Sequence, residues 1–250
     1  MIAIPNHLND YPIEIDLPDI RRYARGNTGI PYVYSFDTRL PGPHTMINAL
    51  AGGNQICGAI AVKALLDLDV RPRCGRLTLA FANIDAYLRF DRANPYASKY
   101  VDQDFGRLWD PCMLDDTAID SIELRRARQM RPIIDTVDFL LDLRSTDERG
   151  APLNVCGPHD KDIALARQLR SSSRIVSAAG DMADRRLRDY GEFGAPDNSK
   201  VALQIQCGQH WESFSVLVAK DSVARFLLAT GTLDISDFSF RWFSCLPAAM

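Results

Sequence analysis

The clearest sign of the fold class is one segment, Val137-Asp-Phe-Leu-Leu-Asp-Leu-Arg-Ser-Thr-Asp147. Residues 137–143 form an apolar run of strand length, which is typical of a strand buried on both faces of a parallel sheet. The polar residues 144–147 follow at the carboxyl end of that strand, where open α/β sheets place their ligand sites. We therefore predict a strand over 137–143 and a candidate site where it ends.

Strand and helix patterns alternate on both sides of this segment. They predict strands over 13–17, 32–36, 45–50, 76–82 and 201–207, and helices over 56–68, 118–131, 160–169, 182–190 and 213–230. Residues 90–109 are polar and interrupted by proline, which predicts a long irregular loop with a functional role. The alternation predicts one α/β domain over residues 1–250 with a largely parallel central sheet flanked by helices.

Composition narrows the class of protein. The chain has 250 residues, 46% of them apolar, and a net charge of −3. Acidic and basic residues are interspersed, which argues against nucleic acid or an anionic membrane as a partner. The basic run Arg185, Arg186 and Arg188 is interpreted as the solvated face of a helix. No stretch has the length of a membrane span or the form of a signal peptide, so we expect a cytoplasmic protein.

Four stretches in a fixed order carry a family resemblance. They are Asn48-Ala-Leu-Ala-Gly-Gly-Asn-Gln-Ile-Cys-Gly-Ala-Ile-Ala61, the region 90–109, Leu140-Leu-Asp-Leu-Arg-Ser-Thr146 and Gln206-Cys-Gly-Gln-His-Trp-Glu212. Together they resemble the catalytic domain of the succinylglutamate desuccinylase/aspartoacylase family, relatives of the zinc carboxypeptidases. The resemblance implies a zinc-carboxypeptidase-like mixed, mostly parallel sheet. It also implies that the small C-terminal β domain of the family is largely absent.

The same resemblance implies a zinc site, whose residues are replaced in this chain. The family pattern has a His-Gly-Asn-Glu loop, a later histidine ligand and a glutamate that handles the proton of the metal-bound water. Gly52, Gln55 and Arg144 stand at the ligand positions, and Gln206 stands at the general-base position. None of these side chains offers a competent zinc ligand or base. We therefore expect no metal, no other cofactor and no catalytic residue.

A positive pocket is the feature that the resemblance leaves in place. Arg107 matches the substrate arginine of the family, Lys99 stands in for a further basic residue, and Gly106 occupies an asparagine position. With Arg144 they predict binding of a small anionic ligand, such as an acidic or N-acyl amino acid. The alternative is that Arg144 folds onto Asp142 or Asp147 and fills space.

Several functions remain open on sequence grounds. We expect an inactive homologue of a zinc-dependent hydrolase of amide or ester bonds in N-acyl amino acids, binding a small carboxylate or a protein partner. The alternative is an active desuccinylase- or deacylase-like hydrolase with a rebuilt or misaligned metal site. Cys57, Cys207 and His210 are its candidate ligands, and Cys207 with His210 is a candidate nucleophile pair. A scaffolding role in an oligomer is a third hypothesis.

Overall fold

Helices and strands alternate along the computed structural model, which describes residues 11–172, 174–179, 185–238 and 242. The order is β1 (Val33–Asp37), β2 (His44–Ala49), α1 (Ile56–Asp67), β3 (Arg76–Phe81), α2 (Ile84–Tyr87), α3 (Pro111–Asp115), α4 (Ile122–Ile134), β4 (Phe139–Thr146), β5 (Leu153–Cys156), α5 (Asp160–Leu169), β6 (Ile175–Ser177), β7 (Val201–Gln209) and α6 (Ser213–Ala229). Short 3-10 helices lie between these elements.

One seven-stranded sheet, of order β1-β3-β2-β4-β7-β5-β6, forms the centre of the domain. The four strands β3, β2, β4 and β7 are mutually parallel. β1 pairs antiparallel with β3, β5 pairs antiparallel with β7, and β6 runs parallel to β5. The prediction of a mixed, mostly parallel sheet is therefore confirmed, and the parallel centre brings four strand carboxyl ends to one edge of the sheet.

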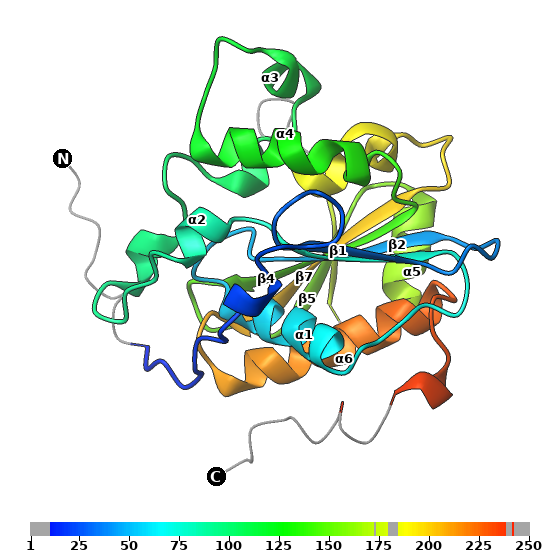
Figure 1. Ribbon diagram of the computed structural model, residues 1–250. Helices are drawn as coiled ribbons and strands as arrows, with labels where there is room; N and C mark the ends of the chain where they lie inside the picture. The colour runs from blue at the N-terminus through cyan, green and yellow to red at the C-terminus, as the bar shows by residue number, and fades with distance from the viewer. Residues whose placement is uncertain (1–10, 173, 180–184, 239–241, 243–250) are drawn as a thin grey trace.

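Helices cover both faces of the sheet. Figure 1 shows α1 and α6 together on one face and α4 on the other. Alternate residues of β4 enter two separate clusters, because successive side chains of a strand point to opposite faces. Leu141 and Leu143 pack into the α1 and α6 cluster, whereas Leu140 packs into the α4 cluster with Leu124. The central strand is buried on both faces, as its apolar run predicts.

Most predicted elements are present, and the differences have local causes. Residues 13–17 are not a strand, although the backbone N–H of Glu14 donates to the carbonyl of Trp211 at 3.0 Å. α4 begins later than predicted because the Ser121 hydroxyl caps it, accepting from the backbone of Leu124 at 3.0 Å. Part of the predicted 182–190 helix lies outside the described residues, and its described part contains the 3-10 helix Leu187–Asp189. The sequence patterns missed β5 and β6, which are only four and three residues long.

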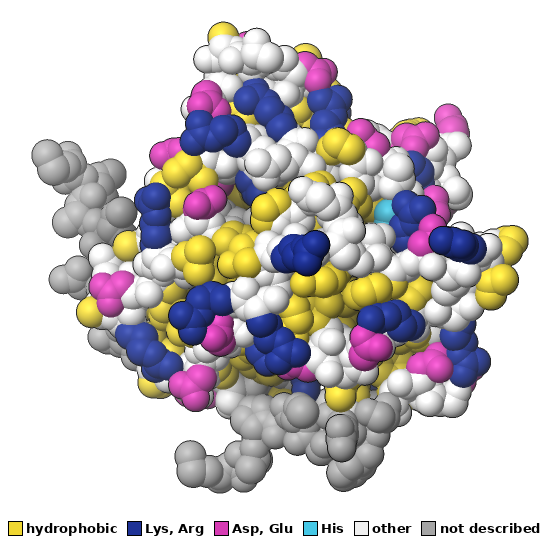
Figure 2. Space-filling view, viewed as in Figure 1, with side chains coloured by type: hydrophobic (Ala, Val, Ile, Leu, Met, Phe, Trp, Pro, Cys, Tyr) yellow, Lys and Arg dark blue, Asp and Glu magenta, His cyan; other side chains and the backbone are white. Residues whose placement is uncertain are grey.

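The surface of the molecule is mixed in charge. On the face in Figure 2, Lys and Arg side chains are interspersed with Asp and Glu. Over the described part of the chain, every helix is too short or too polar to cross a lipid bilayer.

Candidate functional site

The carboxyl ends of β2, β4 and β7 meet at a pocket of about 340 Å³. All six residues that sequence analysis assigned to the site line this pocket: Gly52, Gln55, Lys99, Arg107, Arg144 and Gln206. The register explains part of this arrangement, because Arg144 pairs directly with Gln206 across β4 and β7. Segments about 150 residues apart in the sequence are thus brought together at the edge where parallel α/β sheets place their sites.

The loop after β2 makes one wall of the pocket. Gly53 is needed there because a Cβ atom would lie 2.5 Å from the backbone nitrogen of Tyr87 and closer still to the carbonyl oxygen of Ser98. The close approach lets the Gly53 N–H donate to the carbonyl of Lys99 at 3.0 Å. This contact fixes the irregular segment that carries Lys99 beside Gly52.

Gln55 ties this loop to β4. Its Oε1 accepts from the backbone N–H of Gly52 at 3.2 Å, and its Nε2 donates to the carbonyl of Ser145 at 3.4 Å. The side chain is buried, so these two backbone groups use both ends of its amide. Gln55 therefore closes the loop onto the strand through both ends of its amide.

Arg144 is a nearly buried cation with a fixed orientation. Its side chain is 10% exposed, and its Nε donates to Oδ2 of the buried Asp142 at 2.6 Å. Oδ1 of Asp142 accepts from Nδ2 of Asn48 on β2 at 2.8 Å. Arg144 does fold onto Asp142, as the space-filling alternative predicted, and it also lines the pocket. Removing one partner of a buried ion pair of this kind lowers the free energy of unfolding by about 3–5 kcal/mol.

Gly106 makes room for this guanidinium. A Cβ atom at position 106 would lie 2.6 Å from Nη2 and 2.9 Å from Cζ of Arg144, and closer still to Nη1. The residue lies in the 3-10 helix Phe105–Arg107, whose first turn is capped by the Asp104 carboxylate accepting from the Gly106 N–H at 2.9 Å. An asparagine at position 106 could not coexist with Arg144 in this orientation.

A buried carboxylate that sequence analysis missed organises the segment carrying Lys99 and Arg107. Glu123 on α4 is fully buried. It accepts from the backbone N–H groups of Val101 at 2.6 Å, Asp102 at 3.1 Å and Gln103 at 3.3 Å. It also accepts from Nδ2 of Asn83, just after β3, at 3.1 Å. In the sequence Glu123 looks like an ordinary acidic residue in the first turn of a charged helix, which gave no signal of this role.

His210 joins the end of β7 to the end of β4. Its Nδ1 is 2.7 Å from Oγ of Ser145, and its Nε2 is 2.8 Å from Oδ1 of Asp147. The hydrogen bond from His210 lowers the pKa of Asp147. Because His210 is buried and bonded at both nitrogens, it acts as a structural link between the two strand ends.

The two candidate cysteines face away from the pocket. Cys57 and Cys207 are fully buried in the α1 and α6 cluster. A hydrogen bond with Cys57 and burial raise the pKa of the Cys207 thiol well above its ordinary value. Cys207 therefore stays a neutral thiol and does not form a nucleophile pair with His210. Among the described residues, no group of three or more His, Cys, Asp and Glu side chains is arranged to hold a metal ion.

The residues at the family's zinc position do not fit a zinc ion. Glycine 52 has no side-chain donor, the Gln55 amide is bonded to backbone at both ends, and Arg144 brings a positive charge to the site. A divalent cation beside that guanidinium would be repelled, and none of these three positions supplies an anionic ligand. No step of a metal-dependent reaction is therefore assigned to this pocket.

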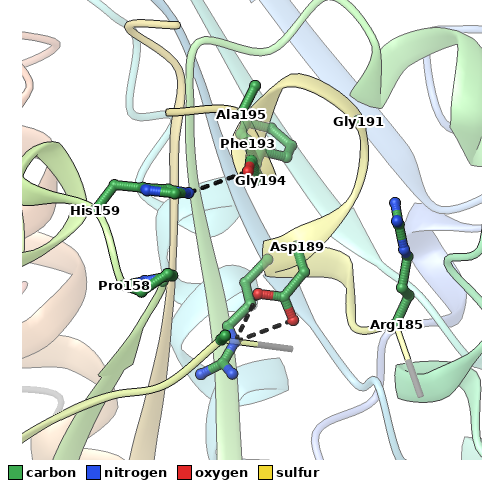
Figure 3. A pocket seen from close by; sticks show the side chains of 11 residues that line it. Pro158, His159, Arg185, Asp189, Gly191, Phe193, Gly194 and Ala195 are labelled. Carbon is green, nitrogen blue, oxygen red and sulfur yellow. Dashed lines mark hydrogen bonds and ion pairs between the residues drawn. The ribbon is translucent and has the colours of Figure 1, made fainter. Parts of the chain in front are cut away.

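A second hollow, of about 390 Å³, lies between the start of α5 and the segment 185–195. Figure 3 shows His159 directed toward the carbonyl of Gly194, which its Nε2 contacts at 3.1 Å, with Arg185 standing apart on the other side. Arg188 is buried and paired with Asp189, with N–O distances of 3.3 Å. Its interpretation as a solvated helix residue was wrong, because the chain here forms a short 3-10 helix that packs onto β7. None of the predicted site residues lines this hollow.

Comparisons with known proteins show the same fold. No protein-family model matches the sequence, and no curated protein matches it. Three similar solved structures are a protein described as a succinylglutamate desuccinylase/aspartoacylase from Shewanella frigidimarina (TM-score 0.63, 12% identity), a succinylglutamate desuccinylase from a Silicibacter species (0.61, 14%) and an aspartoacylase family protein from Mesorhizobium loti (0.60, 18%). Each match covers 81% of this chain, and 68%, 61% and 62% of the respective neighbour. The predicted resemblance is thus confirmed at the level of the fold.

Proposed function

We propose that this chain is a catalytically inactive homologue of the desuccinylase/aspartoacylase hydrolases that binds a small carboxylate ligand in the pocket at the ends of β2, β4 and β7. The observation that carries the proposal is the buried Arg144–Asp142 pair at a metal-ligand position of the family. An ion pair built into the strand stabilises the site without metal, because neither buried charge is left unpaired.

Hydrolysis would need a group that activates water, and the pocket lacks one at the expected place. Gln206 stands there, and a glutamine amide neither takes up nor delivers a proton near neutral pH. Asp147, which also lines the pocket, is held by His210 and has a lowered pKa, so it is a weak base. At the position of the family's general base, the site therefore offers no group that activates water.

The charges of the pocket favour an anion. Four basic side chains line it, namely Lys99, Arg107, Arg144 and Arg186, against three carboxylates, namely Asp104, Asp147 and Glu148. Both signs are partly paired: Arg107 lies 3.6 Å from Asp104, and Arg144 pairs with Asp142. Asp147 binds His210, and Glu148 accepts from the Tyr11 hydroxyl at 2.6 Å. Guanidinium and ammonium groups bind carboxylates through charge-assisted hydrogen bonds, which are about twice as strong as neutral ones.

Metal content is the first test. Protein purified without chelator is analysed for zinc by elemental analysis, and zinc is titrated into it by calorimetry. We expect far less than one equivalent and no binding heat. Stoichiometric zinc would overturn the proposal and favour an active enzyme with ligands from elsewhere in the chain.

A rebuilt variant serves as the matched positive control. It carries four substitutions to the family residues at the ligand and general-base positions: Gly52→His, Gln55→Glu, Arg144→His and Gln206→Glu. A fifth substitution, Gly106→Asn, restores the asparagine of the family pattern beside position 144. We expect this variant to bind about one equivalent of zinc. If the two proteins have the same zinc affinity, the replaced residues do not determine whether the pocket binds metal.

A further inference from the structure

The way Arg144 is held points to the class of ligand. Resting on the proposed function, we infer that the pocket selects a ligand with two carboxylates, one bound by the segment of Lys99 and Arg107 and the other by Arg144. An N-acyl amide would offer Arg144 an uncharged carbonyl in place of a carboxylate and is then the weaker ligand.

The first step is the set of donors that Arg144 has left. Its Nε is used by Asp142. Within the described part of the chain, neither Nη1 nor Nη2 donates a hydrogen bond to another residue, and both lie against Gly106 in the pocket lining. A guanidinium that is fixed at Nε and has two nitrogens without a protein acceptor, in a residue that lines a pocket, is suited to bind a carboxylate.

The second step is the discrimination between a carboxylate and an amide. The Arg144 side chain is only 10% exposed, so its charge is screened less by water than that of a surface arginine. A carboxylate gains charge-assisted hydrogen bonds there, while an amide carbonyl offers a neutral acceptor to the same donors. An anion at this place also offsets the cost of keeping the guanidinium away from solvent.

The third step is a second cationic point on a separate segment. Lys99 and Arg107 lie on the irregular chain that Glu123 anchors from α4, whereas Arg144 lies on β4. The pocket that they line, about 340 Å³, is within the range of small-molecule sites. Arg144 reaches it from β4 and lies against Gly106 of the other segment, and two cationic points in one lining match a dianion better than a ligand with one charge.

The test compares matched ligands by isothermal titration calorimetry. Succinate is paired with its monoamide succinamate, and glutarate with glutaramate, so that each pair differs only in the second carboxylate. We expect the dicarboxylate to bind at least tenfold more tightly to the wild-type chain. Arg144→Ala should abolish this ratio, and Arg107→Gln should weaken both members of each pair while largely keeping it.

Gly106→Ala separates charge from geometry. The added methyl group would collide with the end of the flexible Arg144 side chain, which can move without unfolding the domain. We expect this variant to reduce the dicarboxylate preference although no charge is changed. Gly150→Ala is the control, because a Cβ atom there meets no atom within 4 Å. It should bind both ligands as the wild type does, and thermal unfolding checks that every variant is folded.

Each outcome bears on one of the two proposals. Equal affinity for the two ligands, or tighter binding of the monoamide, overturns the inference while the proposed carboxylate site stands. Absence of binding by all four ligands overturns the site itself. A dicarboxylate preference that survives Arg144→Ala and Gly106→Ala assigns the second carboxylate to another residue and also overturns the inference.

Discussion

Replacing Glu123 with glutamine should both destabilise the domain and weaken the site. In the wild type Oε1 accepts from Val101 and Asn83, and Oε2 accepts from Asp102 and Gln103. A glutamine keeps one acceptor and turns an NH2 group toward the other pair of donors. Hydrogen bonds to a charged group contribute about 1.5–3 kcal/mol each, so we expect a loss of about 3 kcal/mol in the free energy of unfolding. For a chain of this size that is a fall in Tm of about 6–12 °C.

Urea unfolding and carboxylate titration of the same preparations measure both effects. The matched control is Glu192→Gln, which removes an exposed glutamate paired with Lys200 and should change the stability by less than about 1 kcal/mol. Glu123→Gln should also lower carboxylate affinity several-fold, because the segment carrying Lys99 and Arg107 loses its anchor. A variant as stable as the control, with wild-type affinity, would refute the role assigned to Glu123.

Three further predictions concern buried polar side chains. Burial lowers the pKa of His44 to about 4, so the unfolded chain binds a proton that the folded chain does not between about pH 6.5 and 4. The free energy of unfolding should therefore fall by about 3 kcal/mol as the pH drops through this window. Urea unfolding at pH 7, 5.5 and 4.5 measures this fall, and the free energy of unfolding of His44→Asn should fall less over the same range. Ser145→Ala should cost about 1–2 kcal/mol, because it leaves Nδ1 of the buried His210 without its hydroxyl partner, and wild-type stability in thermal melts would contradict this. Arg126→Lys should lower the free energy of unfolding by about 2–4 kcal/mol, since a lysine cannot reproduce the three hydrogen bonds that the guanidinium donates to backbone carbonyls. A loss below about 1 kcal/mol in chemical unfolding would show that these three hydrogen bonds are dispensable.

Much of the fold was predictable from hydrophobic periodicity and from the order of the motifs, for reasons that particular elements illustrate. The segment 137–147 was informative because β4 lies at the centre of the sheet with neighbours on both sides and helices on both faces. β5 and β6 could not be found in the same way, because they are short strands near one edge of the sheet. Residues 13–17 have the apolar alternation of a strand, yet pack along α6 and the end of β7 without joining the sheet.

The sequence did not predict the hydrogen bonds among the residues assigned to the candidate site. Six residues were assigned from sequence, and all six line one pocket. The sequence could not tell that Gln55 bonds backbone at both ends, or that Arg144 both pairs with Asp142 and lines the cavity. Nor could it identify Glu123, because a carboxylate that accepts from backbone groups of a distant loop leaves no periodic or spaced pattern. Such contacts depend on tertiary packing, which local sequence does not encode.

The steric dependence between Gly106 and Arg144 makes these two positions a coupled pair. A side chain at position 106 would displace the guanidinium of Arg144 from its place beside Asp142. Substitutions at the two positions should therefore be non-additive, so that a larger residue at position 106 is better tolerated once Arg144 has been shortened.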